Sequence, residues 1–216
     1  MNKVASWFCK IFLAPLVGRF FIKEVREIKN LPKGSFILAS NHLSYLDIPM
    51  NAYLCLPRAF NFIGQIDGFK GVLKWLVSFV YFLSGVIPLD RKNKKSKEKT
   101  IKRAVSALKR GRILIIYPEG GRSKDGKLKS GKLGIAKIFL KTGVPIVPVA
   151  LKGTFELMPP GGKFKIKKIV SINIGKALML QKEFQKAQEL NEDSEEHHNL
   201  LRGVTDRVMS EIASLL

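Results

Sequence analysis

Residues 36–47 read FILASNHLSYLD, a short apolar run followed by a polar turn that holds a histidine and an aspartate. The run 36–40 has the length and apolar character of one buried strand, and the residues that follow, up to Cys55, have a helical pattern. A strand that leads into a helix is the repeating unit of α/β folds. We therefore expect His42 on the turn that leaves the strand, and Asp47 in the first turn of the helix.

The same alternation continues along the rest of the chain. Strand candidates are AFNFIG (59–64), ILIIYP (113–118), PIVPVAL (145–151) and the half-exposed stretch 165–174. Helical patterns occupy residues 95–110, residues 135–141 and the tail from Leu200 to Leu215. Strands that alternate with helices predict an α/β fold in which a mostly parallel central sheet is flanked by helices.

The first 30 residues form a basic, aromatic-rich segment. Lysine and arginine residues interrupt its apolar character, so no run approaches the ~20 residues that a membrane-spanning helix needs. It also lacks the small-residue cleavage site of a secretory signal. Such a segment is typical of an amphipathic helix lying in the bilayer interface. We expect residues 1–30 to associate with a membrane and residues 31–216 to form the functional domain; a helix packed on the core is the alternative for the segment.

A second uncharged run, residues 75–89, is shorter than a membrane span and is broken by Gly85 and Pro88. This pattern predicts a buried or membrane-dipping helix followed by a short strand.

The charge balance points to an anionic partner. The chain has 38 Lys and Arg against 17 Asp and Glu, a net charge of +21. Eight of the acidic residues lie in 183–216, so the basic surface belongs to the body of the protein. Nucleic acid, an anionic bilayer and an acidic substrate all fit this charge. The two cysteines, Cys9 and Cys55, have no spacing that suggests a disulfide framework or a metal site.

His42 and Asp47 have the chemistry of a general base. A carboxylate that accepts a hydrogen bond from one imidazole nitrogen orients the ring, and the other nitrogen takes a proton. The sequence has no GxSxG elbow and no cysteine near a second histidine, so the reacting hydroxyl is expected from a substrate. Taken alone, the HxxxxD spacing also fits a structural histidine.

Three further blocks follow in order: GVIPLDR (85–91), YPEGGRS (117–123) and VPIVPVA (144–150). Together with NHLSYLD they resemble the four ordered blocks of the glycerolipid acyltransferase family, most closely its bacterial 1-acylglycerol-3-phosphate acyltransferase branch. The resemblance extends from about residue 35 to residue 151, which makes 31–216 the expected acyltransferase domain. Four blocks in one order are far more specific than any one of them.

The resemblance implies an enzyme of phospholipid biosynthesis that makes phosphatidic acid from 1-acylglycerol 3-phosphate. The acyl donor would be a thioester of coenzyme A or of acyl carrier protein, with no further cofactor and no metal. His42 would be the general base and Asp47 its orienting partner. Residues implied to hold the acceptor are Arg91, Glu119, Gly120, Gly121 and Arg122. Guanidinium groups and closely approaching backbone N–H groups are the donors that a phosphate favours.

The implied partners are anionic membrane lipids, a lysophospholipid acceptor and acyl carrier protein, at the cytoplasmic side of the cell membrane, with peripheral or monotopic attachment. Two positions depart from the family pattern. Gly121 replaces the usual Thr, and Pro88 stands where a bulky apolar residue is more common. Both departures bear on the choice of acceptor.

Other functions stay open at this point. The enzyme could use another acceptor, such as glycerol 3-phosphate, a lyso-aminolipid or a lipid A precursor. A catalytically silent lipid-binding relative is a second alternative. A nucleic-acid-binding module suits the charge, but the chain lacks a recognisable signature and its aromatic residues cluster in apolar runs. We therefore expect no nucleic acid partner.

Overall fold

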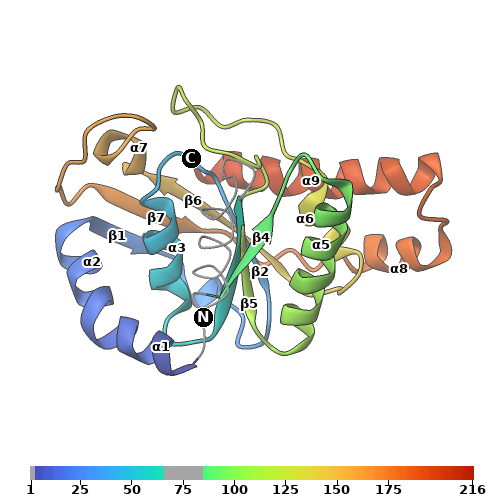
Figure 1. The fold of residues 1–216 in the computed structure, drawn as a ribbon, viewed down its shortest axis with the longest axis horizontal. Helices are drawn as coiled ribbons and strands as arrows, with labels where there is room; N and C mark the ends of the chain where they lie inside the picture. The colour runs from blue at the N-terminus through green and yellow to red at the C-terminus, as the bar shows by residue number, and fades with distance from the viewer. Residues whose placement is uncertain (1–2, 66–84) are drawn as a thin grey trace.

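The computed structural model describes residues 3–65 and 85–216, and its centre is a seven-stranded sheet (Figure 1). The strands are β1 (Ile22–Arg26), β2 (Ile37–Ser40), β3 (Phe60–Gln65), β4 (Val86–Leu89), β5 (Ile113–Ile116), β6 (Ile146–Lys152) and β7 (Val170–Ile174). Their order across the sheet is β1-β7-β6-β2-β5-β3-β4. Only β6 and β7 pair antiparallel among these described strands, which confirms the prediction of a mostly parallel sheet.

Helices cover both faces of the sheet (Figure 1). They are α1 (Lys3–Phe8), the π-helical turn η1 (Cys9–Leu13), α2 (Ala14–Phe20), the 3₁₀ turn η2 (Ile28–Asn30), α3 (Asp47–Cys55), α5 (Lys94–Lys109), α6 (Gly134–Phe139), α7 (Thr154–Leu157), α8 (Gln181–Glu189) and α9 (Glu195–Leu215). Among the described residues, none of these helices combines the length and apolar character needed to cross a membrane.

The period-two pattern of β2 explains why the sheet has two cores. Ile37 belongs to the core cluster that includes Leu108 of α5 and Val208 of α9. Leu38, on the opposite side of the strand, belongs to the cluster that includes Met50 of α3. Successive side chains of a strand point to opposite faces, so a strand buried on both faces is apolar throughout. The central strands β2 and β5 are buried at every position.

The N-terminal segment is helical only as far as Phe20, and residues 22–26 then form the edge strand β1. β1 pairs with β7, which lies far away in the sequence, so the local sequence pattern does not predict this edge strand. In the predicted strand 165–174, only Val170–Ile174 joins the sheet. The predicted helix within 75–89 lies before Gly85 and so falls outside the described residues, whereas the short strand after it is β4.

Candidate active site

The topology brings two sequence blocks to one edge of the sheet. β2 and β5 are parallel neighbours, so the turns that leave their carboxyl ends lie side by side. His42 lies on the turn after β2, and Glu119 lies on the turn after β5. In α/β sheets this edge is the usual place for ligands.

His42 and Asp47 form the predicted pair. Nδ1 of His42 lies 2.8 Å from Oδ2 of Asp47, the first residue of α3. The same carboxylate oxygen accepts the backbone N–H groups of Leu43 at 2.6 Å and Ser44 at 2.7 Å. The Asp47 side chain is fully buried, whereas the His42 side chain keeps 15% exposure. Because Nδ1 is engaged by Asp47, Nε2 is the nitrogen that an incoming hydroxyl would meet.

Both backbone groups of His42 are held by the turn that follows β5. The His42 N–H donates to Oε1 of Glu119 at 2.6 Å, and the His42 carbonyl accepts the Ser123 N–H at 2.8 Å. Oε2 of Glu119 accepts the Lys129 N–H at 3.0 Å. Burial raises the pKa of Glu119, and the two backbone donors oppose this rise. Both oxygens of the Glu119 carboxylate therefore accept backbone N–H groups, and the carboxylate positions His42.

Tyr117 contributes a contact that the sequence did not reveal. Its ring stacks on the His42 ring, with centroids 3.9 Å apart and planes 14° from parallel. Its hydroxyl accepts a hydrogen bond from Asn51 of α3 at 3.2 Å. Burial, followed by the charge of Asp47, raises the pKa of Tyr117 well above its ordinary value, so the phenol stays neutral. The stacked ring limits the tilt of the imidazole.

The predicted acceptor-binding residues gather around the same turn but differ in their contacts. Nη1 of Arg91 donates to the Gly120 carbonyl at 3.0 Å. The guanidinium of Arg122 stacks over the Tyr45 ring, 3.4 Å from its centroid. Gly120 has a φ of +69°, a conformation that glycine adopts without strain.

A pocket of about 460 Å³ opens at the exposed side of His42. Its polar lining includes Arg91, Gly120, Gly121 and Lys132, while Glu119 and Arg122 do not line it. Its apolar lining comes from strands β3, β4 and β5, from helices α5 and α6, and from the residue before α6: Ile63, Leu89, Ile101, Ile116, Leu133, Ile135 and Ile138. Lys132 is a second residue that sequence reasoning missed, because no motif singles it out from the neighbouring lysines. The pocket therefore combines cationic and apolar side chains with one face of His42.

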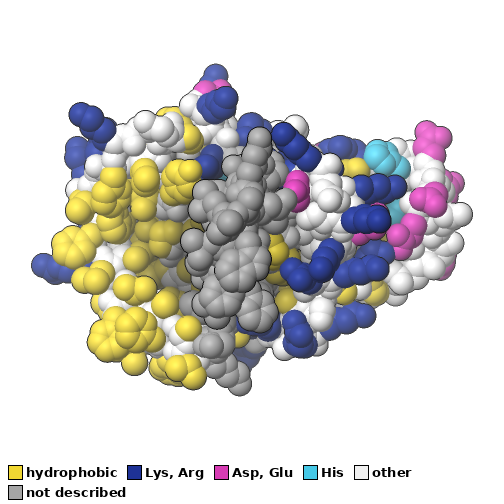
Figure 2. Space-filling model, viewed as in Figure 1, with side chains coloured by type: hydrophobic (Ala, Val, Ile, Leu, Met, Phe, Trp, Pro, Cys, Tyr) yellow, Lys and Arg dark blue, Asp and Glu magenta, His cyan; other side chains and the backbone are white. Residues whose placement is uncertain are grey.

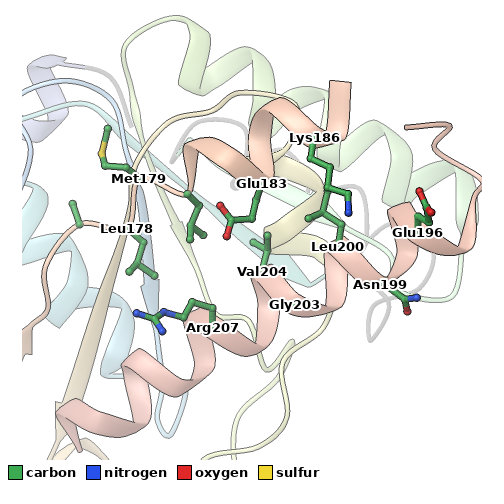
Figure 3. Close-up of a pocket in the computed structure, with 12 residues that line it drawn as sticks. Leu178, Met179, Glu183, Lys186, Glu196, Asn199, Leu200, Gly203, Val204 and Arg207 are labelled. Atoms are coloured by element: carbon green, nitrogen blue, oxygen red, sulfur yellow. The ribbon is translucent and has the colours of Figure 1, made fainter. Parts of the chain in front are cut away.

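A larger hollow of about 1000 Å³ lies between α8 and α9 (Figure 3). Glu183 and Lys186 of α8 and Arg207 of α9 line it, together with the strand-to-helix segment at Leu178. It shares no lining residue with the pocket at His42 and contains none of the four sequence blocks. This hollow therefore has no part in the candidate site.

Among the described residues, no group of three or more His, Cys, Asp and Glu side chains is placed to hold a metal ion. Cys55 is buried, and burial raises the pKa of its thiol to about 12, so it stays protonated near neutrality. The nucleophile that the geometry accommodates is a hydroxyl placed at Nε2 of His42.

The fold and the site define a class: an α/β protein with a histidine–aspartate base at the carboxyl edge of a mostly parallel sheet. The family model described as Acyltransferase matches residues 23–152, which contain all four sequence blocks. The chain belongs to the acyltransferase family, and the resemblance drawn from the four blocks is confirmed.

Several curated relatives support this assignment. The chain is 34% identical over 165 residues to the chloroplastic 1-acyl-sn-glycerol-3-phosphate acyltransferase BAT2 of Brassica napus, covering 75% of this chain and 46% of the relative. It is 32% identical over 147 residues to the 1-acyl-sn-glycerol-3-phosphate acyltransferase of Bacillus subtilis (strain 168), covering 67% of each. The chain thus spans about half the length of the chloroplastic relatives it matches.

A solved structure has the same fold. The 1-acyl-sn-glycerophosphate (LPA) acyltransferase PlsC from Thermotoga maritima superimposes with a TM-score of 0.62 at 26% sequence identity. The match covers 96% of this chain and 82% of that chain. The similarity therefore extends well beyond residues 23–152 that the family model matches.

Proposed function

We propose that this protein transfers an acyl group from a thioester to the free hydroxyl of 1-acylglycerol 3-phosphate and so forms phosphatidic acid. The observation that carries the proposal is the Nδ1–Oδ2 contact of 2.8 Å between His42 and Asp47, at a pocket that His42 lines together with cationic and apolar side chains. The relatives named above as 1-acyl-sn-glycerol-3-phosphate acyltransferases support this choice of acceptor.

The reaction follows from the state of the imidazole. Asp47 accepts the Nδ1–H bond, so the neutral ring presents the lone pair of Nε2. Nε2 takes the proton of the acceptor hydroxyl while the hydroxyl oxygen forms a bond to the thioester carbonyl carbon. The tetrahedral intermediate then collapses, the C–S bond breaks, and His42 returns the proton to the thiolate. The products are phosphatidic acid and a free thiol, and no acyl-enzyme forms.

The pocket lining suits the two ends of such an acceptor. Arg91 and Lys132 would bind the phosphate, with the backbone at Gly120 and Gly121 close enough to add N–H donors. The apolar interior would accommodate an acyl chain. Arg122 remains a predicted phosphate ligand, although it is stacked on Tyr45 and would have to leave that ring to enter the pocket.

The surface features suit work at a membrane. Figure 2 shows apolar side chains gathered over the α1 and α2 end of the molecule, where Trp7, Phe8 and Phe12 are more than half exposed. We infer that this segment lies in the interface of the cytoplasmic leaflet, as a peripheral or monotopic anchor. Lys and Arg side chains crowd the surface over α5 (Figure 2), which would attract the phosphates of coenzyme A or an acidic acyl carrier protein.

A competition assay tests the acceptor. Purified protein would receive a long-chain acyl-CoA, or the acyl carrier protein thioester, with equal concentrations of 1-acylglycerol 3-phosphate, glycerol 3-phosphate and a lyso-aminolipid. We expect thiol release in step with phosphatidic acid formation. Preferential acylation of another acceptor would keep the acyltransferase activity but replace the substrate. Thiol release from neither donor, with lipid present, would contradict the proposal.

A further inference from the structure

Residues 161–169, GGKFKIKKI, form a fully exposed loop between α7 and β7. Phe164 is 50% exposed and Ile166 is 64% exposed, and both are flanked by lysines. A long loop without secondary structure normally presents polar residues to water. Here two large apolar side chains are presented instead, on a segment whose charged residues are all cationic.

The loop is fixed at the side of the molecule that carries both α2 and the candidate active site. The Phe164 ring contacts Phe21, the residue after α2, with ring centroids 5.8 Å apart. The Lys165 N–H donates to the Leu157 carbonyl at 2.8 Å. Three residues before the loop, the Met158 carbonyl accepts a hydrogen bond from the hydroxyl of Ser44, which lies on the turn of His42. The exposed apolar residues of α2 therefore continue onto this loop.

Charge and polarity together identify the surface that the loop fits. Alternating lysines and apolar residues match a bilayer interface, where apolar side chains enter the acyl region and ammonium groups bind anionic headgroups. A lysine near an anionic leaflet strengthens binding about fivefold. Eight of the 17 acidic residues lie in 183–216, and those at the junction of α8 and α9 lie at the other end of the molecule (Figure 2).

We propose that residues 161–169 are a second membrane-contact element, which docks on an anionic lipid bilayer beside the α1 and α2 segment. The loop inserts Phe164 and Ile166 and uses Lys163 and Lys165 to bind headgroups. This inference rests on the proposed function for its membrane context. It adds that the docked loop holds the turn of His42 at the interface, where a lysophospholipid is dissolved.

Matched variants test the loop. Lys163→Gln with Lys165→Gln removes two charges from it, and Lys182→Gln with Lys186→Gln removes two exposed charges from α8. Ile166→Ser removes an exposed apolar side chain from the loop, and Met179→Ser, at a residue 55% exposed, is its control. Binding would be measured by flotation with vesicles of phosphatidylcholine alone and of phosphatidylcholine with phosphatidylglycerol in equal amounts.

We expect the loop charge variant to bind the anionic vesicles about 25-fold more weakly, and Ile166→Ser to weaken binding several-fold on both vesicles. The α8 pair and Met179→Ser should stay within twofold of wild type. Equal losses in the loop and α8 pairs would show a net-charge effect and overturn the proposal. Unchanged binding of both loop variants, or no vesicle binding by wild type, would also overturn it.

Acyl transfer to 1-acylglycerol 3-phosphate in detergent micelles separates the two proposals. If wild type transfers the acyl group in micelles and the loop variants bind vesicles like wild type, the membrane-contact role of the loop is refuted and the proposed function stands. If wild type does not transfer the acyl group in micelles but the loop variants bind vesicles more weakly than wild type, the proposed function is refuted and the membrane-contact role of the loop stands.

Discussion

The carboxylate of Asp47 explains how a histidine five residues away becomes its partner. Along a regular helix these two positions would point ~140° apart. Oδ2 of Asp47 instead gathers the N–H groups of Leu43 and Ser44, which bends the chain before α3 and returns the His42 ring to the same oxygen. One buried side chain, Asp47, therefore fixes both the turn and the orientation of the His42 ring.

Glu119 provides a pH-dependent prediction. Burial raises its pKa above 4.5, so the folded protein holds this proton more tightly than the unfolded chain does. Its ionisation therefore costs stability: its contribution is most favourable below pH 4.5 and is lost as pH rises through the folded pKa. We expect the free energy of unfolding of wild type, relative to Glu119→Gln, to fall with rising pH in that window. Urea unfolding at several pH values measures it, and a relative stability that rises with pH would contradict the cause assigned here.

The adjacent glycines Gly120 and Gly121 should respond differently to substitution. A Cβ at Gly120 would lie 2.8 Å from Cδ of Lys132, on a backbone with φ of +69°. Gly120→Ala should therefore lose about 1–2 kcal/mol of stability. A Cβ at Gly121 meets only Nη1 of Arg91, at 3.4 Å, so Gly121→Thr, the usual family residue, should stay within about 0.5 kcal/mol of wild type. Thermal unfolding compares them, and an equal loss in both would refute this interpretation.

At the scale of elements, Asn41 ties the end of β2 to β6 one residue before the base. Its Nδ2 donates to the Leu151 carbonyl at 2.9 Å, and its Oδ1 accepts the Leu151 N–H at 2.8 Å. Both side chains are buried. One side-chain amide thus fixes both the register of two strands and the position of the His42 turn.

Removal of this amide should be costly. Asn41→Ala leaves a buried donor and a buried acceptor without partners, each worth about 1–3 kcal/mol, so we expect a loss of about 2–6 kcal/mol. Asn30→Ala is the matched control, because Asn30 makes one bond, to the Ile174 carbonyl at 2.9 Å, and its loss should be about 1 kcal/mol. Chemical denaturation measures both variants. Equal losses of stability in the two variants would mean that the two hydrogen bonds of Asn41 do not fix the strand ends.

The elements that the sequence predicted are those whose burial is encoded locally. β5 is apolar at each position, and α5 repeats Ile101, Val105 and Leu108 at helical spacing. β1 was not predicted because Lys23 and Glu24 interrupt its apolar pattern and its partner β7 lies far along the chain. The sequence predicted that His42 and Asp47 meet, but the stacking of Tyr117 and the anchoring by Glu119 depend on the contact of two distant loops.

At the scale of the whole molecule, charge and apolar surface are separated along the long axis. Apolar side chains cover the α1 and α2 end, cations cover α5, and acidic side chains mark the junction of α8 and α9 (Figure 2). Composition predicted the basic body and the acidic C-terminal region. It did not predict which surface carries each group, because that depends on which face of the sheet each helix covers. The separation suits an enzyme that meets a lipid acceptor at one surface and an anionic donor at another.

The measurement that tests the central claim most directly is the rate of acyl transfer by wild type, His42→Ala and His198→Ala, with 1-acylglycerol 3-phosphate and an acyl thioester. His198 is an exposed histidine on α9, away from the four sequence blocks, and it controls for the loss of an imidazole as such. If Nε2 of His42 is the base, His42→Ala should lose a factor of about 10²–10⁴ in kcat while His198→Ala stays within about twofold of wild type. A His42→Ala protein that turns over at the wild-type rate would contradict the assignment of the His42–Asp47 pair as the catalytic base.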